Sequence, residues 1–324
     1  MAVVETVNGP IDVEALGQTL MHEHVLLLDP EILKNYPGEG VPEDVVATAA
    51  GKLRKIKGQG VDTIVDLTVI GLGRDVEQVR AIAHDTGLNV IVATGIYAFD
   101  KVPKFFRFRG PTTPGGGPEV MTELFIRDIR EGIADTGIKA AILKCATDVE
   151  GVTPDVERVL RACGQTQRET GVPITTHADA STRRGLEQQR VLRDEGVDLS
   201  RVVIGHCGDT TDLEYLTAIM DAGSFVGMDR FGLQALLSTE DRIKTVAELI
   251  RRGYVDRIVL SQDASACGMT FSPEVLERLH PDYRLDYIFE SVIPVMGDYG
   301  ISDDEIHTML VANPRKIFAT QGAY

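Results

Sequence analysis

The sequence predicts a (β/α)8 barrel, the TIM-barrel fold of the α/β class, as a single domain spanning residues 1–324. One sequence pattern recurs seven times along the chain: a polar helical stretch, a Gly, and then a short apolar run rich in Val and Ile. The apolar run TLMHEHVLL (19–27) precedes the first of these repeats and supplies an eighth strand. Strands that alternate with helices form parallel sheets, and eight such strands close into a barrel.

A glycine lies at the end of the helical part of each repeat. Gly has no Cβ, so it adopts the positive φ that commonly ends a helix. The apolar run after each glycine has the length and the β-branched composition of a buried parallel strand. The seven glycines are Gly60, Gly87, Gly137, Gly171, Gly196, Gly223 and Gly253.

Helical patterns fill the intervals between these strands. They are expected at 43–57, 75–86, 119–135, 154–169, 183–195, 210–222 and 240–252. A last helix is expected at 302–318, with Ser302 as its N-cap. The alternative fold is an open doubly wound sheet. We disfavour it because no G-x-G-x-x-G follows the first strand and the Gly-rich stretch PTTPGGGPE (111–119) is typical of a loop.

Composition and charge narrow the possible partners. With 43% hydrophobic and 25% charged residues, the chain has the composition of a globular protein. The net charge of −16 disfavours nucleic acid, anionic membranes and strongly anionic substrates, and it favours a neutral ester, lactone or amide. The four cysteines are far apart, and we see neither a secretory signal nor a membrane-spanning run. We therefore expect a cytoplasmic location.

Active sites of such barrels lie at the carboxyl ends of the strands. Four of the seven histidines fall at these predicted ends, whereas His84, His280 and His307 fall in helical or loop segments and are expected at the surface. In chain order, the strand-end residues are His22, His24, Asp66, Thr68, Tyr97, Lys144, His177, His206, Asp229, Arg230 and Asp263.

The motif MHEHV (21–25) places two histidines at i and i+2 of the first strand. Because strand side chains alternate between faces, His22 and His24 should both enter the barrel, and Glu23 should point outward to the helices. Two neutral imidazoles on one face suit a borderline metal ion. The alternative is a pair of hydrogen-bonded histidines that cap the strand.

Three further residues favour the metal interpretation. His177 and His206 end the fifth and sixth strands, and Asp263 ends the eighth strand, which adjoins the first in a closed barrel. Imidazoles and a carboxylate that converge on one mouth require a counter-charge, and a metal ion supplies it. Taken singly, each histidine could instead be a hydrogen-bonded buried residue, and Asp263 could be the N-cap of the next helix.

Lys144 ends an otherwise apolar strand, and the residue types and their spacing do not decide among three roles for it. It could reach the rim or pair with Asp263, it could form a Schiff base, or CO2 could convert it into an anionic carbamate. Cys145 and Cys207 each follow a strand-end residue directly. Alternation turns them outward, so we expect thiols packed in the core.

The order of these residues resembles the binuclear amidohydrolase superfamily: H-x-H, then Lys, His, His and Asp on the first, fourth, fifth, sixth and eighth strands. Several sequence motifs are similar to those of the phosphotriesterase family, and most similar to those of its phosphotriesterase-like lactonases. These motifs are MHEHV, VDLT, ATGIY, THAD, VIGHCGDTTD, MDRFG and NPRKIF. The resemblance runs from about residue 4 to the C-terminus.

This resemblance implies two divalent transition metal ions per chain, such as Zn, Co, Mn or Fe. His22, His24 and Asp263 would hold the more buried ion, and His177 and His206 the more exposed one. Lys144, carboxylated on its side-chain nitrogen, would bridge both ions together with a hydroxide. Tyr97 and Arg230 match positions that line the lactonase site. The alternative role for Tyr97 is a packed aromatic whose hydroxyl binds a metal ligand, and the alternative for Arg230 is a salt bridge to a rim carboxylate such as Asp229.

Two positions depart from the family pattern or extend it. Gln262 stands directly before Asp263, where many relatives have His or Asn, and strand alternation should turn it away from the site. Asp179 lies two residues after His177 and is expected on the following loop.

The activity that the resemblance implies is hydrolysis of lactones, with N-acyl-homoserine lactones (and hence quorum quenching) as the first choice and triester hydrolysis as a side activity. Asp263 would accept the proton of the attacking hydroxide, and Tyr97 would stabilise the oxyanion. The segment 264–282 should select the substrate, either through a channel lined by Met269, Phe271, Val275 and Leu276 or as a helix packed on the barrel. The alternatives are a dedicated phosphotriesterase (an aryldialkylphosphatase), a catalytically silent ligand-binding homologue and a Schiff-base aldolase. The family also suggests a homodimer.

Overall fold

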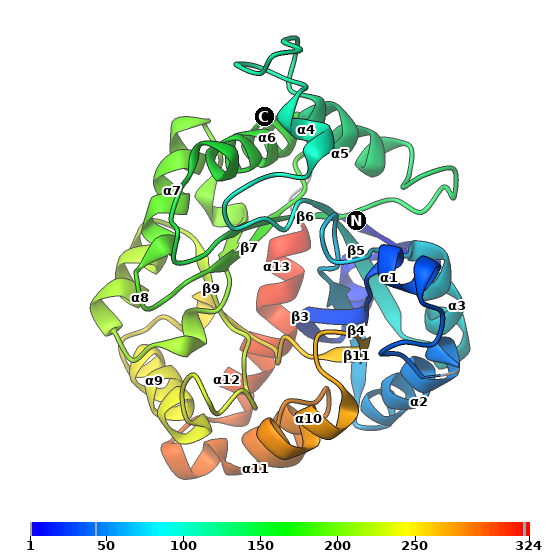
Figure 1. Cartoon of the computed structure of the whole chain (residues 1–324). Helices are drawn as coiled ribbons and strands as arrows, with labels where there is room; N and C mark the ends of the chain where they lie inside the picture. Colours follow the sequence, from blue (N-terminus) through cyan, green and yellow to red (C-terminus); the bar gives the residue numbers. More distant parts are fainter. Residues whose placement is uncertain (1, 43, 320–321) are drawn as a thin grey trace.

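The computed structural model describes residues 2–42, 44–319 and 322–324, and it has the architecture of a (β/α)8 barrel (Figure 1). All neighbouring barrel strands pair in parallel. The strands are β3 (Gln18–Leu27), β4 (Val61–Asp66), β5 (Asn89–Gly95), β6 (Ile142–Thr147), β7 (Ile174–Ala178), β8 (Val202–Ile204) and β9 (Phe225–Met228), followed by an eighth strand in two parts, β10 (Ile258–Leu260) and β11 (Ser265–Gly268).

The eighth strand closes the ring, although it is interrupted. Its first part, β10, pairs with β9, and its second part, β11, pairs with β3. The segment 261–264 between the two parts also binds β3: Asp263 N donates to His22 O at 3.0 Å, and His24 N donates to Ala264 O at 3.0 Å. The closed barrel predicted from the sequence is therefore confirmed, and the open sheet is excluded.

The seven expected helices lie outside this ring, as Figure 1 shows. They are α2 (Val45–Gly58), α3 (Val76–Thr86), α5 (Val120–Arg130), α6 (Pro154–Thr170), α7 (Arg184–Asp194), α8 (Leu213–Asp221) and α9 (Thr239–Arg251). Residue 43, the expected start of the first of them, lies outside the described residues. The expected helix 119–135 is too long by several residues, because Gly132 has a φ of 128° and lies so close to Gly137 that a Cβ would be 2.8 Å from the Gly137 Cα.

The C-terminal helix was predicted within a few residues. It runs through α12 (Asp303–His307), the π-helical turn η7 (Thr308–Ala312) and α13 (Asn313–Ala319). Ser302 caps it as expected: its hydroxyl accepts from Glu305 N, while the Glu305 carboxylate accepts from Ser302 N. An N-terminal hairpin of β1 (Val3–Thr6) and β2 (Gly9–Asp12), followed by the 3-10 turn η1 (Val13–Leu16), was not predicted.

The interior of the barrel is filled rather than hollow. Alternate strand residues such as Val65, Ile91 and Phe225 form an inner apolar cluster, and Leu16 of η1 joins them at the amino ends of the strands. A separate, larger cluster lies between the strands and the outer helices. Because the lower barrel is packed solid, polar chemistry is confined to the carboxyl ends.

Several loops at the carboxyl ends carry short helices of their own. These are α1 (Pro30–Asn35) after β3, α4 (Lys104–Arg107) after β5 and α10 (Pro273–Leu279) after β11. The chain then passes through η5 (Ile288–Val292), α11 (Ile293–Met296) and η6 (Gly297–Tyr299) before the final helix. Within the described parts of the chain, no helix combines the length and apolar composition that a membrane crossing requires.

A pair of Gly→Ala substitutions tests the close approach of β5 and β6. Gly95 has a φ of 145°, and a Cβ there would be 1.9 Å from Lys144 O, whereas nothing lies within 4 Å of a Cβ at Gly51 in α2. We expect Gly95→Ala to lower the free energy of unfolding by about 2–4 kcal/mol. Gly51→Ala should raise it by about 0.5–1 kcal/mol because alanine is the better helix former. Urea unfolding measures both changes, and equal midpoints for Gly95→Ala and the wild type would contradict this reading of the β5–β6 contact.

Candidate active site

Six of the strand-end side chains meet inside the carboxyl end of the barrel, and we call them the central cluster. Asp263 lies in the middle: its Oδ1 is 3.5 Å from His22 Nε2 and 3.4 Å from His24 Nε2, and its Oδ2 is 3.7 Å from His206 Nε2. Each of the six is at most 8% exposed. The members are His22, His24, Lys144, His177, His206 and Asp263.

Two members of the cluster are held in a strained backbone conformation. His206 has a φ of 60° and Asp263 a φ of 58°, in the left-handed region that residues with a Cβ rarely adopt. Such conformations persist where the surrounding structure enforces them, and they concentrate at functional sites. Both residues lie beyond the regular pairing of their strands, so the strain turns their side chains into the mouth.

Asp229 holds two of the imidazoles from behind. His22 Nδ1 lies 2.8 Å from Asp229 Oδ2, and His206 Nδ1 lies 3.0 Å from Asp229 Oδ1. A carboxylate can only accept here, so both rings carry their proton on Nδ1. The Nε2 lone pairs of His22 and His206 therefore face the centre of the cluster.

A hydroxyl and a second carboxylate orient His24 in the same way. Thr68 Oγ1 donates to Asp66 Oδ1 at 2.6 Å, and it lies 2.8 Å from His24 Nδ1. Since the Thr68 proton is already used, its oxygen accepts the Nδ1 proton of His24. The Nε2 lone pair of His24 therefore also points inward, toward Asp263.

His177 has the opposite orientation. Its Nε2 lies 3.2 Å from Asp148 Oδ2, and its Nδ1 lies 3.3 Å from the hydroxyl of Tyr97. Asp148 accepts the Nε2 proton, which leaves the Nδ1 lone pair directed toward Tyr97. Three imidazoles thus direct an Nε2 lone pair toward Asp263, and the Nδ1 lone pair of His177 faces the hydroxyl of Tyr97.

Burial keeps the imidazoles of His22, His177 and His206 neutral. It lowers the pKa of His22 and His206 well below the usual value, helped by Lys144 at His22 and by Arg230 at His206. The pKa of His177 is also lowered, chiefly by burial, although Asp148 opposes the shift. Burial by itself would raise the pKa of Asp263, but His206, His22 and Arg230 outweigh it, so the carboxylate stays ionised. Neutral imidazoles beside an ionised carboxylate are the protonation states that metal ligation needs.

Lys144 is enclosed by the barrel instead of reaching the rim. Its side chain is 1% exposed, and Nζ lies 2.7 Å from His22 Nε2. Burial lowers the pKa of Lys144 to about 8, although Asp263 and Asp229 favour the charged form. Lys144 therefore does not reach the rim, and its hydrogen-bond partner is His22 and not Asp263.

Arg230 joins two carboxylates at the mouth. Its Nε donates to Asp263 Oδ2 at 2.9 Å, and its Nη1 donates to Asp209 Oδ2 at 3.0 Å. The expected salt bridge to a rim carboxylate is therefore present, but its partner is Asp209 and not Asp229, whose oxygens bind His22 and His206. Asp209 is held in turn by the fully buried Arg242 of α9, whose Nη2 lies 2.7 Å from Asp209 Oδ1.

A cavity of about 460 Å³ opens above His177 and Arg230. Tyr97 lines it, and its ring lies edge-on to that of Phe99, with the centroids 4.9 Å apart. Leu236 supplies a further apolar wall. Burial, followed by the charge of Asp263, raises the pKa of Tyr97 above its usual value, so its hydroxyl keeps its proton. The lining thus combines apolar side chains with charged ones, which are Asp148, Asp179, Asp209 and Arg230.

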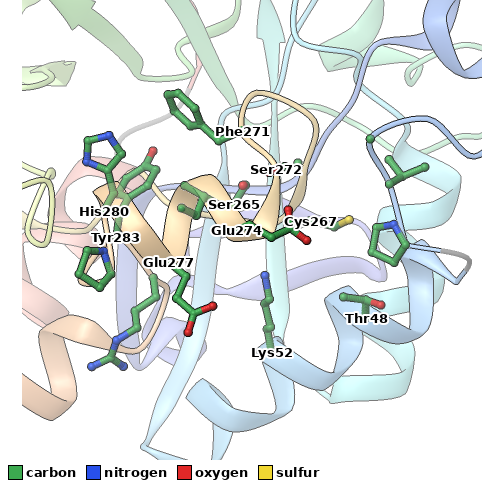
Figure 2. Close-up of a pocket in the computed structure, with 17 residues that line it drawn as sticks. Thr48, Lys52, Ser265, Cys267, Phe271, Ser272, Glu274, Glu277, His280 and Tyr283 are labelled. Atoms are coloured by element: carbon green, nitrogen blue, oxygen red, sulfur yellow. The ribbon is translucent and has the colours of Figure 1, made fainter.

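The loop after the eighth strand does not line this cavity, contrary to the expected channel. Phe271 and Leu276 instead line a second cavity of about 770 Å³ on the flank of the barrel. Figure 2 shows Lys52 of α2 and Glu274 of α10 on opposite sides of this flank cavity. Among the described residues around the mouth cavity, none comes from 264–282.

Glu23 departs from the simple alternation rule. The carboxylate is fully buried and accepts hydrogen bonds from the eighth-strand segment, so it does not reach the outer helices. The pairing of β3 with β4 shifts register between Leu20 and Glu23, and such irregularities re-aim side chains.

The remaining expectations agree with the geometry. Gln262 turns away from Asp263 and donates to Leu285 O, and Asp179 lies on the loop after β7. Cys145 and Cys207 are free thiols in the outer core. Sequence reasoning assigned no site role to Asp148 or Asp209, and it treated Asp229, Asp66 and Thr68 only as strand-end residues. Their position at or just after a strand end is the feature of the sequence that could have identified them as site residues.

Ligand atoms fall within 4.8 Å of one another in two groups, His22 with His24 and Asp263, and His22 with His206 and Asp229. The first group can hold a metal ion, because its Nε2 lone pairs and the Asp263 carboxylate face each other. In the second group, Asp229 takes up the Nδ1 protons instead, so its function is to orient the rings.

The buried amine of Lys144 gives a pH signature in metal-free protein. Its pKa is about 8 in the fold and 10.5 in the unfolded chain, so the unfolded state binds more protons between these values. The free energy of unfolding of the wild type should therefore rise from pH 8 to 10.5 relative to Lys144→Met. Denaturant unfolding in CO2-free buffer measures this difference, and Lys101→Met, at an exposed position, should retain the rise. Parallel stability curves for the wild type and Lys144→Met would contradict it.

Comparison with known proteins gives one consistent result. The model of the phosphotriesterase family matches residues 2–318. A phosphotriesterase homology protein of Mycobacterium tuberculosis (strain ATCC 25618 / H37Rv) is 51% identical over the full length of both chains. An aryldialkylphosphatase of Saccharolobus solfataricus is 38% identical, over 95% of this chain and 97% of its own. The solved structure of the phosphotriesterase from Mycobacterium tuberculosis superposes with a TM-score of 0.97 at 51% identity, over 99% of this chain and 100% of the other. The chain therefore belongs to the phosphotriesterase family and is a hydrolase that acts on ester bonds.

Proposed function

We propose that this protein is a metal-dependent lactonase that opens N-acyl-homoserine lactones, and thereby quenches quorum signals, with organophosphate triester hydrolysis as a side activity. The observation that carries the proposal is the central cluster itself. Three imidazoles direct Nε2 lone pairs toward one ionised carboxylate, and a fourth imidazole and a buried lysine lie beside them.

The donor set fits two divalent transition ions such as Zn, Co, Mn or Fe. His22, His24 and Asp263 would hold the deeper ion, and His177 and His206 the one nearer the mouth. Lys144 would bridge them as a carbamate, because a buried amine with a pKa of about 8 is partly neutral near pH 7 and can react with CO2. When bound, such ions would lower the pKa of a shared water and polarise the substrate carbonyl.

Three side chains would then act on the substrate. Asp263 accepts the proton of the attacking water and returns it to the leaving alkoxide, which stays attached in a hydroxy acid product. Arg230 holds Asp263 in place through its 2.9 Å contact. Tyr97, which keeps its proton, donates to the oxyanion that develops on the carbonyl oxygen.

The mouth cavity supports a lactone as the substrate. Phe99 and Leu236 provide apolar contact for an acyl chain, and Tyr97 provides a hydrogen-bond donor for the ring carbonyl. A dedicated phosphotriesterase is the alternative, supported by the name of the aryldialkylphosphatase relative. Both substrate classes are neutral, so the net charge of −16 does not separate them.

We further propose that residues 1–324 form one hydrolase domain and that the protein works as a cytoplasmic homodimer. The continuous barrel sheet supports a single domain. The four free cysteines support a reducing compartment. The homodimer rests on the family resemblance.

A comparison of substrates tests the proposed function. Metal-loaded protein is assayed for kcat/KM on N-acyl-homoserine lactones, unsubstituted γ- and δ-lactones and a paraoxon-type triester. We expect the acyl lactones to be the best substrates, and His177→Asn to lose activity while His84→Asn, an exposed helical histidine, retains it. A triester preference of orders of magnitude would establish the alternative phosphotriesterase, and a protein that holds no metal and turns over none of these would be a silent binding homologue.

Removal of the carboxylate behind two imidazoles should weaken metal binding. In Asp229→Asn, one amide oxygen cannot accept both Nδ1 protons, so His22 or His206 loses its orientation. We expect the metal affinity to fall roughly 10- to 100-fold, as for other residues that orient ligands. Metal content after dialysis against a graded chelator measures the loss. The control is Asp128→Asn, a buried carboxylate that binds Arg74 and Thr94 away from the cluster and should leave the affinity unchanged.

A further inference from the structure

We propose that Glu23, the residue between the two histidines of MHEHV, is a positioning residue that holds Asp263 in its working orientation. The inference concerns the peptide groups on either side of Asp263, and its importance for catalysis rests on the proposed function. The Glu23 carboxylate binds Ser261, Gln262 and Ala264, so it would act through the backbone on either side of Asp263.

The eighth strand needs this support where it is interrupted. β10 ends at Leu260 and β11 begins at Ser265, so the peptides between them lack regular ladder partners on one side. Glu23 supplies those partners: Oε1 accepts from Gln262 N at 2.9 Å, and Oε2 accepts from Ala264 N at 2.9 Å. The two oxygens therefore bind the residues immediately before and after Asp263.

A serine ties the same carboxylate back to the first strand. Ser261 Oγ donates to Glu23 Oε1 at 2.8 Å and accepts from His22 N at 2.9 Å. The backbone of β3 adds the two hydrogen bonds that close the barrel, from Asp263 N to His22 O and from His24 N to Ala264 O. The backbone bonds to β3 and the bonds of the Glu23 carboxylate to Gln262 N and Ala264 N, together called the clamp, hold Asp263 on both sides. These contacts maintain its φ of 58°.

Only an acceptor with two oxygens satisfies this arrangement. A glutamine would present an amide NH2 to one of the donors, and at 0% exposure water cannot replace the lost acceptor. The polar groups of the clamp would then be partly unpaired. The expected consequence is a looser 261–264 segment and a misdirected Asp263, with the mouth cavity unchanged.

Hydrogen exchange in the metal-free protein tests the clamp directly. Glu23→Gln is compared with Glu119→Gln, a largely buried glutamate that accepts from Met121 N and Arg158 away from the cluster. We expect amide exchange at Gln262 and Ala264 to accelerate at least about tenfold in Glu23→Gln and to stay unchanged in Glu119→Gln. Unchanged exchange at both amides in Glu23→Gln would overturn the inference.

The consequence for Asp263 is measured separately in the cobalt-loaded protein. Glu23→Gln should lose roughly 10- to 100-fold in cobalt affinity and in kcat, with a changed visible cobalt spectrum. KM should stay within about twofold, because the side chains of the mouth cavity are not disturbed. Wild-type affinity, spectrum and kcat in Glu23→Gln would overturn the positioning role.

A second variant covers the case in which Glu23→Gln does not fold. Ser261→Ala removes one donor from Oε1 and keeps both backbone contacts of the carboxylate. Because Ser261 Oγ links Oε1 to the backbone of β3, its loss should loosen the Oε1 end of the carboxylate. We expect amide exchange, relative to the wild type, to accelerate more at Gln262 than at Ala264, and equal protection of Gln262 in Ser261→Ala and wild type would contradict the positioning role of Glu23. A wild-type protein that bound no metal would refute the proposed function, while the exchange results would still decide the contacts of Glu23.

Discussion

The buried carboxylate of Asp263 is the constraint on which the rest of the site depends. An ionised group at this depth is stable only if donors or cations offset its charge. Arg230 follows β9 and neutralises it from the mouth, while imidazoles of β3 and of the segment after β8 face it from within. Barrel closure is what brings residue 263 beside residues 22 and 24. The hydrogen bonds that close the barrel between the first and last strands are therefore the ones that also position Asp263.

Behind the imidazoles lies a layer of carboxylates that determines which nitrogen faces inward. Asp229 serves two rings, Asp66 serves a third through Thr68, and Asp148 serves His177. Asp229 and Asp148 accept the proton of one ring nitrogen directly, whereas Asp66 accepts from the Thr68 hydroxyl, which in turn accepts from His24. The other nitrogen of each ring keeps its lone pair. Carboxylates behind histidine ligands orient the rings and raise their basicity. Part of the acidity of this chain is thus placed where it prepares neutral histidines to bind a cation.

Different loops line the two cavities at the carboxyl end of the barrel. The mouth cavity receives residues from the loops after β5, β6, β7, β8 and β9, and it lies directly over the cluster. The flank cavity lies between α2 and the loop that carries α10 (Figure 2). Tyr283 connects the two regions, because it lines the flank cavity while its hydroxyl donates to Asp263 O. Changes in the last loop can therefore reach the cluster through the backbone of Asp263, without contact with a substrate in the mouth.

The sequence by itself determined the eight strands, most of the helices and the identity of the six central side chains. The strands and helices follow from local periodicity, and the rule that barrel strands end at one face selects the four histidines and Asp263. Lys144 joined the site only through the family resemblance. The orientation of each ring, the pairing of Arg230, the location of Phe271 and Leu276 and the contacts of Glu23 were decided only by the tertiary structure. The reason is the sequence distance between partners: His22 and Asp229 are 207 residues apart, and Glu23 and Ala264 are 241 apart. A register shift of β3 and the interruption of the eighth strand set those contacts, and neither leaves a periodic signal in the sequence.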